Sequence, residues 1–479
     1  MSGSNNTTVY GGDEINAIVL DPGSFHTRIG YAGDDFPKVV TSSCYASPTD
    51  DAMTDSTSSS RIFGEAINVP RANYKVSPIL KDSIIEDWDA AVDQYSHYFK
   101  TILNIEYPEH PLLVTEPVWA EHSYRKTMVE NFYEHFDFAA LYLAKAPTCI
   151  SFQQGRSNCL VVDIGHDSVS VTPVIDGISL LKNSMRTHYA GQFLSDQVKD
   201  FVDSKQGLAV QSTYKVRSKT PTVYPEAAQY QERDVTQVTT SFDEYQQAKV
   251  WHEFKETVFE IPEKSLTSPN PQTSNLKEFY SLEVHRRMFE FPTGQSVPLG
   301  FERFQLAESI FDPVSYKFHT QELADKYPAN NGELKFSNLY DDYKPIKRMR
   351  KAESSQSTPT PAGFGASTTT EARGLSQLIT HTLSTIDIDL RASVAHNIIV
   401  TGGLSLIPQL TERLYNELCT ANPGLKIRLH AAGNSSERVN QAWIGGSVLA
   451  SLGTFHQMWV SKEEYEEAGA ERILNQRFR

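Results

Sequence analysis

Two aspartates, Asp21 and Asp163, each follow a short apolar run and stand two positions before a glycine. A hairpin tip built from small residues lets consecutive backbone N–H groups point at one anion, which is what binding a triphosphate requires. A carboxylate just before such a turn can serve Mg²⁺ as a ligand, directly or through a retained water. One Asp-x-Gly alone is more often only a turn, so the prediction depends on the two copies. We therefore expect Asp21 and Asp163 on the metal side of a nucleotide site.

The same local design positions both aspartates: a strand, a tight turn and a second strand. The predicted strands cover residues 16–20 and 27–32 around the first turn, and 159–162 and 168–174 around the second. Such a repeat predicts two similar lobes that face each other.

A third segment has a different pattern. Residues 397–401 predict a buried strand, Gly402-Gly403 a tight turn, and residues 410–418 an amphipathic helix. A strand, a double glycine and a helix in this order are typical of a nucleotide contact. The apolar stretch 443–460, dotted with small residues, predicts closely packed helices.

Length and composition exclude several classes of protein. The 479 residues exceed what one hydrophobic core supports, so we expect several subdomains. We find no apolar run of the roughly 20 residues that a bilayer span needs. The four cysteines are scattered, which argues against a zinc site or a disulfide framework and favours a reducing compartment. The net charge of −15 argues against broad phosphate-mediated nucleic-acid binding; it either only keeps the protein soluble or suits basic protein partners.

The motifs together resemble the actin, Hsp70 and sugar-kinase superfamily, and within it the actin family along most of the chain. The matching segments are DPGSFHTRIGYAGDDFP (21–37), DWDAA (87–91), LLVTEPV (112–118), DIGHDSVSVTPVIDG (163–177), FERFQLAESIFDP (301–313), DIDLR (387–391), VTGGLSLIPQLTERL (400–414) and WIGGSVLASLGTFHQMWVSKEEYEEAG (443–469). The resemblance implies an α/β actin-like ATPase fold, with two lobes and four subdomains around a central nucleotide cleft.

The resemblance also implies subdomain boundaries. The inner subdomain of lobe one is expected at 1–42, 79–153 and 441–479, and its small outer subdomain at 43–78. The inner subdomain of lobe two is expected at 154–189 and 319–440, and the outer one at 190–318. Residues 352–372 lack aliphatic side chains, so we expect a disordered insertion over about 344–372.

Position by position, the resemblance implies ATP and Mg²⁺ as cofactors. Asp21 and Asp163 match the metal-side aspartates. The implied nucleotide-binding residues are Ser24, Phe25, Arg28, Gly165, His166, Asp167, Gly191, Lys255, Glu256, Gly402, Gly403 and Leu406. Arg28 replaces the family lysine, and His166 replaces a family aspartate near the metal.

The hydrolytic apparatus departs from the family. Ala146 and Ser170 stand where the family has a glutamine and a histidine that orient the attacking water. Losing water-positioning groups costs phosphoryl transfer several orders of magnitude, by analogy with about 10²- to 10⁴-fold for one acid–base group. We therefore expect no catalytic residue, and ATP that is bound and rarely hydrolysed. The alternatives are an active actin-fold ATPase and a cleft that binds nothing.

Further features resemble a nuclear branch of the actin family, the subunits shared by chromatin-remodelling and histone acetyltransferase complexes. They are VYGGDE (9–14), His166-Asp167-Ser168, the polar insertion and the ending ERILNQRFR (471–479). The implied role is a nuclear scaffold active in chromatin regulation, transcription regulation and DNA repair. The implied partners are actin, a helicase-SANT-associated helix and, as an open question, core histones.

Three stretches bear on partners. Residues 452–459, with Phe455, Met458 and Trp459, form the implied docking surface for that helix, unless these side chains belong to the core. The polar stretch 42–61 argues against self-polymerisation into filaments. A basic cluster at Lys344, Lys347, Arg348, Arg350 and Lys351 predicts nuclear import or only a solvated loop. The sequence leaves open which complex holds the chain, the nucleotide affinity, and whether DNA is contacted directly.

Overall fold

The computed structural model describes residues 17–49, 61–235, 237–266, 275–327, 337–338, 374–431 and 433–478. The N-terminal VYGGDE motif, the middle of the polar stretch 42–61, the insertion over 344–372 and its basic cluster lie outside these residues. Their expected roles stay predictions.

The first large sheet has six strands in the order β22-β9-β8-β1-β2-β3. Strands β1 and β2 form an antiparallel hairpin, while β8 lies parallel to β1 on its other side. The strands are β1 (Ile18–Pro22), β2 (His26–Tyr31), β3 (Val39–Ser42), β8 (Pro111–Glu116), β9 (Ala140–Lys145) and β22 (Val460–Ser461). β1 and β8 are buried along their whole length, as expected of strands covered on both faces.

The second large sheet repeats this arrangement. Its main order is β19-β13-β11-β10-β20-β21, with β10 and β11 as the antiparallel hairpin and β20 parallel to β10. The strands are β10 (Cys159–Ile164), β11 (Val169–Ile175), β12 (Ile178–Ser179), β13 (Met185–Thr187), β19 (Ser337–Asn338), β20 (Ile398–Thr401) and β21 (Leu429–His430). The predicted duplication is confirmed: β10, β11 and β20 of the second sheet correspond to β1, β2 and β8 of the first.

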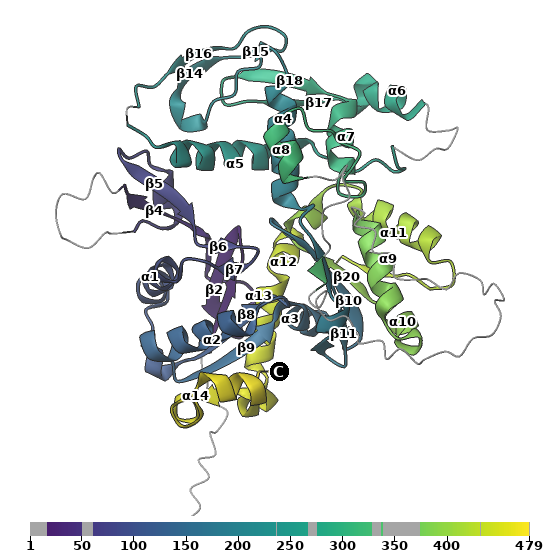
Figure 1. Ribbon diagram of the computed structural model, residues 1–479. Coiled ribbons are helices and arrows are strands. Elements are labelled where there is room, and N and C mark those ends of the chain that lie inside the picture. Colours follow the sequence, from purple (N-terminus) through teal and green to yellow (C-terminus); the bar gives the residue numbers. More distant parts are fainter. Residues whose placement is uncertain are drawn as a thin grey trace, which may run out of the picture.

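Helices cover the outer faces of both sheets and lie between them (Figure 1). In lobe one, α1, α2 and α14 pack on the first sheet; in lobe two, α9, α10 and α11 pack on the second. The helices are α1 (Trp88–Tyr98), α2 (His122–Glu130), α3 (Ala146–Gln153), α4 (Gly191–Asp203), α5 (Thr240–Val258), α6 (Leu276–Ser281), α7 (Phe301–Glu308), α8 (Gln321–Lys326), α9 (Leu375–Thr385), α10 (Ile388–Ala395), α11 (Leu410–Ala421), α12 (Ser435–Val439), α13 (Gln441–Ser451) and α14 (Lys462–Gln476). None of the helices in the described residues is long and apolar enough to span a bilayer.

Helices α3 and α13 cross at very close range between the two sheets. Gly445 of α13 makes this possible, because a Cβ there would lie 1.9 Å from the carbonyl oxygen of Cys149 on α3. The fully buried Trp443 donates from its indole nitrogen to the carbonyl of Val19 in β1, 3.0 Å away. The crossing therefore ties α13 both to the first sheet and to α3.

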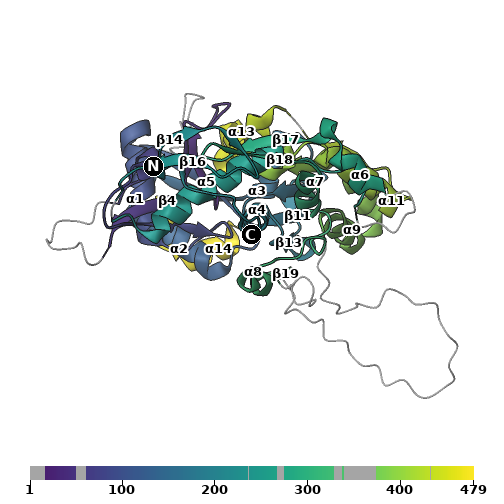
Figure 2. The same ribbon diagram turned by 90° about the horizontal axis from the view of Figure 1, so that it is seen from above.

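Smaller units sit above each large sheet in the view of Figure 1. Over lobe one they are the hairpins β4 (Cys44–Pro48) with β5 (Tyr74–Pro78) and β6 (Leu80–Lys81) with β7 (Ile84–Ile85). Over lobe two, α5 lies beneath two small sheets: β14 (Val216–Thr220) with β16 (Gln229–Glu232), and β15 (Thr222–Val223), β18 (Gln295–Leu299) and β17 (Arg287–Glu290). Figure 2 shows that the described part of the chain forms a flat body. The two-lobed α/β fold expected from the sequence is confirmed, while the residue boundaries of the four subdomains stay predictions.

Candidate nucleotide-binding site

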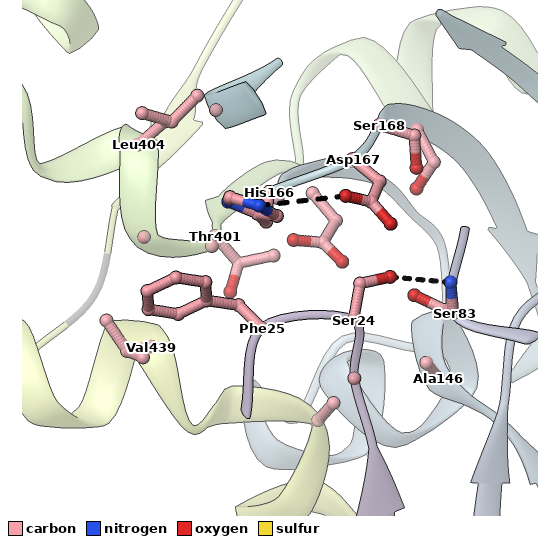
Figure 3. A pocket seen from close by; sticks show the side chains of 18 of the residues that line it. Ser24, Phe25, Ser83, Ala146, His166, Asp167, Ser168, Thr401, Leu404 and Val439 are labelled. Atoms are coloured by element: carbon pink, nitrogen blue, oxygen red, sulfur yellow. Dashed lines mark hydrogen bonds and ion pairs between the residues drawn. The ribbon is translucent and has the colours of Figure 1, made fainter. Parts of the chain in front are cut away.

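The turn between β1 and β2 is tightly closed. The backbone N–H of Gly23 donates to the carbonyl of His26 at 3.1 Å, and a Cβ on Gly23 would lie 2.8 Å from that same oxygen. Only glycine therefore allows this closure without a shift. The turn presents Ser24 and Phe25 at its tip (Figure 3).

The turn between β10 and β11 closes in the same way. The N–H of Gly165 donates to the carbonyl of Ser168 at 3.0 Å, the same three-residue step as in the first turn. This tip rests on the start of α4, where Gly191 and Gln192 donate their N–H groups to the carbonyls of Gly165 and His166. A Cβ on Gly191 would come within 3.1 Å of the His166 Cα, so the hairpin tip and the start of α4 pack closely here.

The two tips border one cavity of about 490 Å³. All fourteen residues predicted for the nucleotide and metal sites line it: Asp21, Ser24, Phe25, Arg28, Asp163, Gly165, His166, Asp167, Gly191, Lys255, Glu256, Gly402, Gly403 and Leu406. They come from both hairpins, from α4 and α5, and from the turn after β20. The structure thus brings the predicted residues together; their contact with a ligand stays a prediction.

The two aspartates occupy equivalent register positions but have different neighbours. Asp21 lies opposite Arg28 in its hairpin, and the guanidinium Nη1 is 3.3 Å from Asp21 Oδ2. Asp163 lies opposite Ser170, which carries no charge. Enclosure by protein and the nearby carboxylate of Asp21 raise the pKa of Asp163 to about 6.

The chemistry of this pair of carboxylates fits Mg²⁺. Within the described residues, no cluster of three or more His, Cys, Asp or Glu side chains forms a metal cage. Mg²⁺ commonly keeps several waters and takes one or two carboxylates together with substrate phosphates, so a cage is not required. A cation would also relieve the repulsion between the two carboxylates, which adds to burial in raising the Asp163 pKa. Asp21 and Asp163 would hold it, and it would neutralise phosphate charge.

Arg28 is more constrained than its predicted role suggested. Besides Asp21, it donates from Nε to Oδ1 of Asn440 at 2.6 Å, a contact between residues 412 positions apart. Asn440 immediately precedes α13, so Arg28 links the first hairpin to that helix. Arg28 lines the cavity, but its positive charge is already paired with the carboxylate of Asp21.

On the opposite side, Lys255 and Gly402 are fixed by their backbone neighbours. Lys255 is 5% exposed and its Nζ donates to the carbonyl of Gly191 at 2.7 Å, while burial lowers its pKa to about 8. Gly402 has φ of 88°, and a Cβ there would lie 2.5 Å from Oδ1 of Asp163. The turn after β20 therefore packs directly on the end of β10.

The two positions at which the expected water-orienting side chains are replaced face the same cavity. Ala146 begins α3 and Ser170 lies in β11, and both line the cavity. Glu116, at the end of β8, also lines it but is fully buried between Arg125 and Lys145, each 2.9 Å away. That carboxylate is engaged by two cations and is poorly suited to act as a base.

Several lining residues were not predicted. His252 lies one helical turn before Lys255 on α5, so the spacing of three residues could have indicated it. Ser83 and Trp119 come from loops of lobe one and Val439 from the end of α12. Ser83 donates its N–H to Ser24 Oγ at 2.7 Å, a contact across 59 residues that no local pattern indicates.

Comparison with known proteins agrees with this fold. A family model described as Actin matches residues 12–479. The chain belongs to the actin family. It is 67% identical over 490 residues to Actin-related protein 4 of Debaryomyces hansenii and 57% identical over 492 residues to that of Candida albicans, each match covering 100% of both chains. It is 36% identical to Actin-related protein 4 of Saccharomyces cerevisiae, covering 98% of this chain and 99% of the relative.

Proposed function

We propose that this chain binds Mg-ATP between its lobes as a structural ligand and hydrolyses it very slowly. The observation that carries the proposal is the single cavity bordered by two glycine-closed hairpins, with Ala146 and Ser170 at its wall. The hairpins supply backbone donors from both lobes, and the two aspartates supply metal ligands. Neither alanine nor a short serine can hold a water in line with a phosphate as a glutamine–histidine pair does.

The other carboxylates that line the cavity each have a partner, and the pairing is most complete for Glu116. Glu116 is paired with two cations, and Asp167 accepts from the N–H of Asp82 at 2.8 Å. Glu256 is paired with His252 at 3.1 Å. A general base needs a free acceptor within reach of the water, and Glu116, whose two oxygens are each held by a cation, does not offer one.

A single-turnover assay tests the proposal. The purified protein is loaded with Mg-ATP, freed of excess nucleotide, and bound nucleotide and released phosphate are followed over hours. We expect one ATP per chain that stays largely intact. Phosphate release at an ordinary enzymatic rate of about 1 s⁻¹ or faster would support the alternative, an active actin-fold ATPase. Absence of bound nucleotide would refute both readings.

A double variant sharpens this test. Ala146→Gln with Ser170→His restores water-orienting side chains at the two cavity positions. We expect hydrolysis to rise by at least about tenfold, a small part of what water positioning contributes. Val448→Gln, at an exposed position of α13 outside the cavity lining, is the matched control and should leave the rate unchanged.

At the level of the cell, we propose a nuclear scaffold subunit of chromatin-remodelling and histone acetyltransferase complexes that pairs with actin on a helicase-SANT-associated helix. The support is the full-length similarity to relatives named Actin-related protein 4. Leu452 and Met458 are 40% and 44% exposed beside the buried Phe455, so part of the expected docking surface is free and part belongs to the core. The net charge of −15 suits basic partners such as core histones.

Affinity purification from nuclear extract, followed by mass spectrometry, tests this role. We expect actin together with remodeller or acetyltransferase subunits, and we expect the purified chain alone to stay in the supernatant under conditions in which actin pellets as filaments. A tagged chain recovered without any such subunit, or a chain that pellets by itself, would contradict the proposal.

A further inference from the structure

Phe25 places a large aromatic ring at the tip of the first hairpin. Phosphate binding by a hairpin tip needs backbone N–H groups and little side chain, so it does not explain a phenyl ring there. The ring lines the cavity, and Figure 3 shows it extending from the turn that also carries Ser24. It therefore calls for a separate explanation.

The ring contacts two elements of the opposite lobe. Its centroid is 4.8 Å from that of His166, at the tip of the second hairpin, and 4.8 Å from that of His252, on α5. The interplanar angles of 37° and 35° are those of tilted aromatic pairs. Such pairs, with centroids between 4.5 and 7 Å, attract each other beyond their simple area burial. Phe25 thus joins lobe one to lobe two directly.

Phe25, His166 and His252 are each held in place by neighbouring residues. The carbonyl of Phe25 accepts from the N–H of Ser43 at 3.2 Å. The carbonyl of His166 accepts from Gln192 at the start of α4, and the His252 ring is paired with Glu256 one turn further on. The contact therefore joins two fixed surfaces, and separating the lobes at this point must break it.

We propose that Phe25 is a clasp that holds the cleft closed over a bound nucleoside triphosphate and sets its rate of release. The inference rests on the proposed function, because it requires nucleotide in the cavity. A nucleotide held by both hairpins leaves only when the hairpins separate, and that motion pulls Phe25 away from His166 and His252. Phe25 acts on retention and takes no part in the chemistry of the phosphates.

Release kinetics test the clasp. The protein is loaded with a fluorescent ATP analogue and Mg²⁺, then chased with excess ATP in a stopped-flow instrument. We expect Phe25→Leu to release the analogue about tenfold faster, because two aromatic pairs are lost while an apolar side chain remains. Phe25→Tyr keeps the ring and should release at nearly the original rate. Phe279→Leu, at an exposed aromatic residue of α6, is the matched control and should not change release.

A double-variant cycle separates the clasp from a general loosening of the cleft. His252→Ala alone should speed release. In the double variant, Phe25→Leu with His252→Ala, the release rate should rise by less than the product of the two single increases. Fully multiplicative effects would show that the two residues do not act together and would overturn the clasp.

Two further outcomes would also refute it. If the unchanged protein binds the analogue and Phe25→Leu releases it at the same rate, the clasp fails while the proposed nucleotide binding stands. If Phe25→Leu binds the analogue more tightly, the ring competes with the nucleotide and does not retain it. Failure of the unchanged protein to bind any analogue would instead refute the proposed function, and the clasp with it.

Discussion

Asp21 and Asp163 are the same residue type at the same point of two matching hairpins, yet their surroundings differ. Arg28 stands across from Asp21, whereas the uncharged Ser170 stands across from Asp163. With a pKa raised to about 6, Asp163 carries its charge at neutral pH and loses it as the pH falls. Arg28 therefore offsets part of the charge of Asp21, whereas Asp163 faces no opposite charge across its hairpin.

This difference predicts a pH dependence of Mg²⁺ binding. Below pH 6 Asp163 becomes protonated in the metal-free protein, so Mg²⁺ must displace a proton and its affinity should fall about tenfold between pH 7.5 and pH 5. Calorimetric titration of Mg²⁺ into the ATP-loaded protein measures this. The Asp163→Asn variant should bind Mg²⁺ more weakly at pH 7.5, and its affinity should change much less between pH 7.5 and pH 5. Any change that remains reports protonation of the ATP phosphates. An unchanged pH dependence in that variant would contradict the assignment.

At the scale of the elements, the α3–α13 crossing is one of the closest backbone contacts that the structure describes. A Cβ at Gly445 would overlap the backbone of Cys149, which no side-chain rotation can relieve. We expect Gly445→Ala to push the helices apart and lower the free energy of unfolding by about 1–3 kcal/mol or more. Denaturant unfolding measures it. Gly453→Ala is the control, because nothing lies within 4 Å of its Cβ position. Equal stability of the two variants would show that the crossing adjusts easily.

Local patterns predicted the elements well. The strand expected at 27–32 is His26–Tyr31, the one at 397–401 is Ile398–Thr401, and the helix expected at 410–418 is Leu410–Ala421. The stretch 443–460 is less uniform than predicted: α13 ends at Ser451 and a 3₁₀ helix, Gly453–Met458, follows. Residues that meet only in the folded chain were missed, such as Asn440 beside Arg28, because spacing along a strand or helix carries no information about such distant partners.

At the scale of the whole molecule, each lobe has its own hydrophobic core, and the cavity lies between the two hairpins that face each other. The core of lobe two reaches the cavity at Ile407, and the contact between the lobes there includes the Phe25 ring against His166 and His252. The sequence predicted this division from its repeated hairpin. It left the closeness of the lobes open, because their contacts involve loops such as the one that carries Asp82, whose N–H donates to Asp167 of the second hairpin.

A ligand held by both lobes should stabilise the molecule as a whole. Binding to the folded state alone adds about 2.7 kcal/mol when ATP is at 100 times its dissociation constant, and the melting temperature should rise steadily with the logarithm of ATP concentration. AMP is the matched control, because it lacks the β- and γ-phosphates that we place between the hairpin tips. At equal concentration it should raise the melting temperature much less. Scanning calorimetry measures both, with Mg²⁺ present throughout. Equal shifts with ATP and AMP would mean that the phosphates do not join the two lobes, and the ligand would then stabilise only the lobe that holds its base.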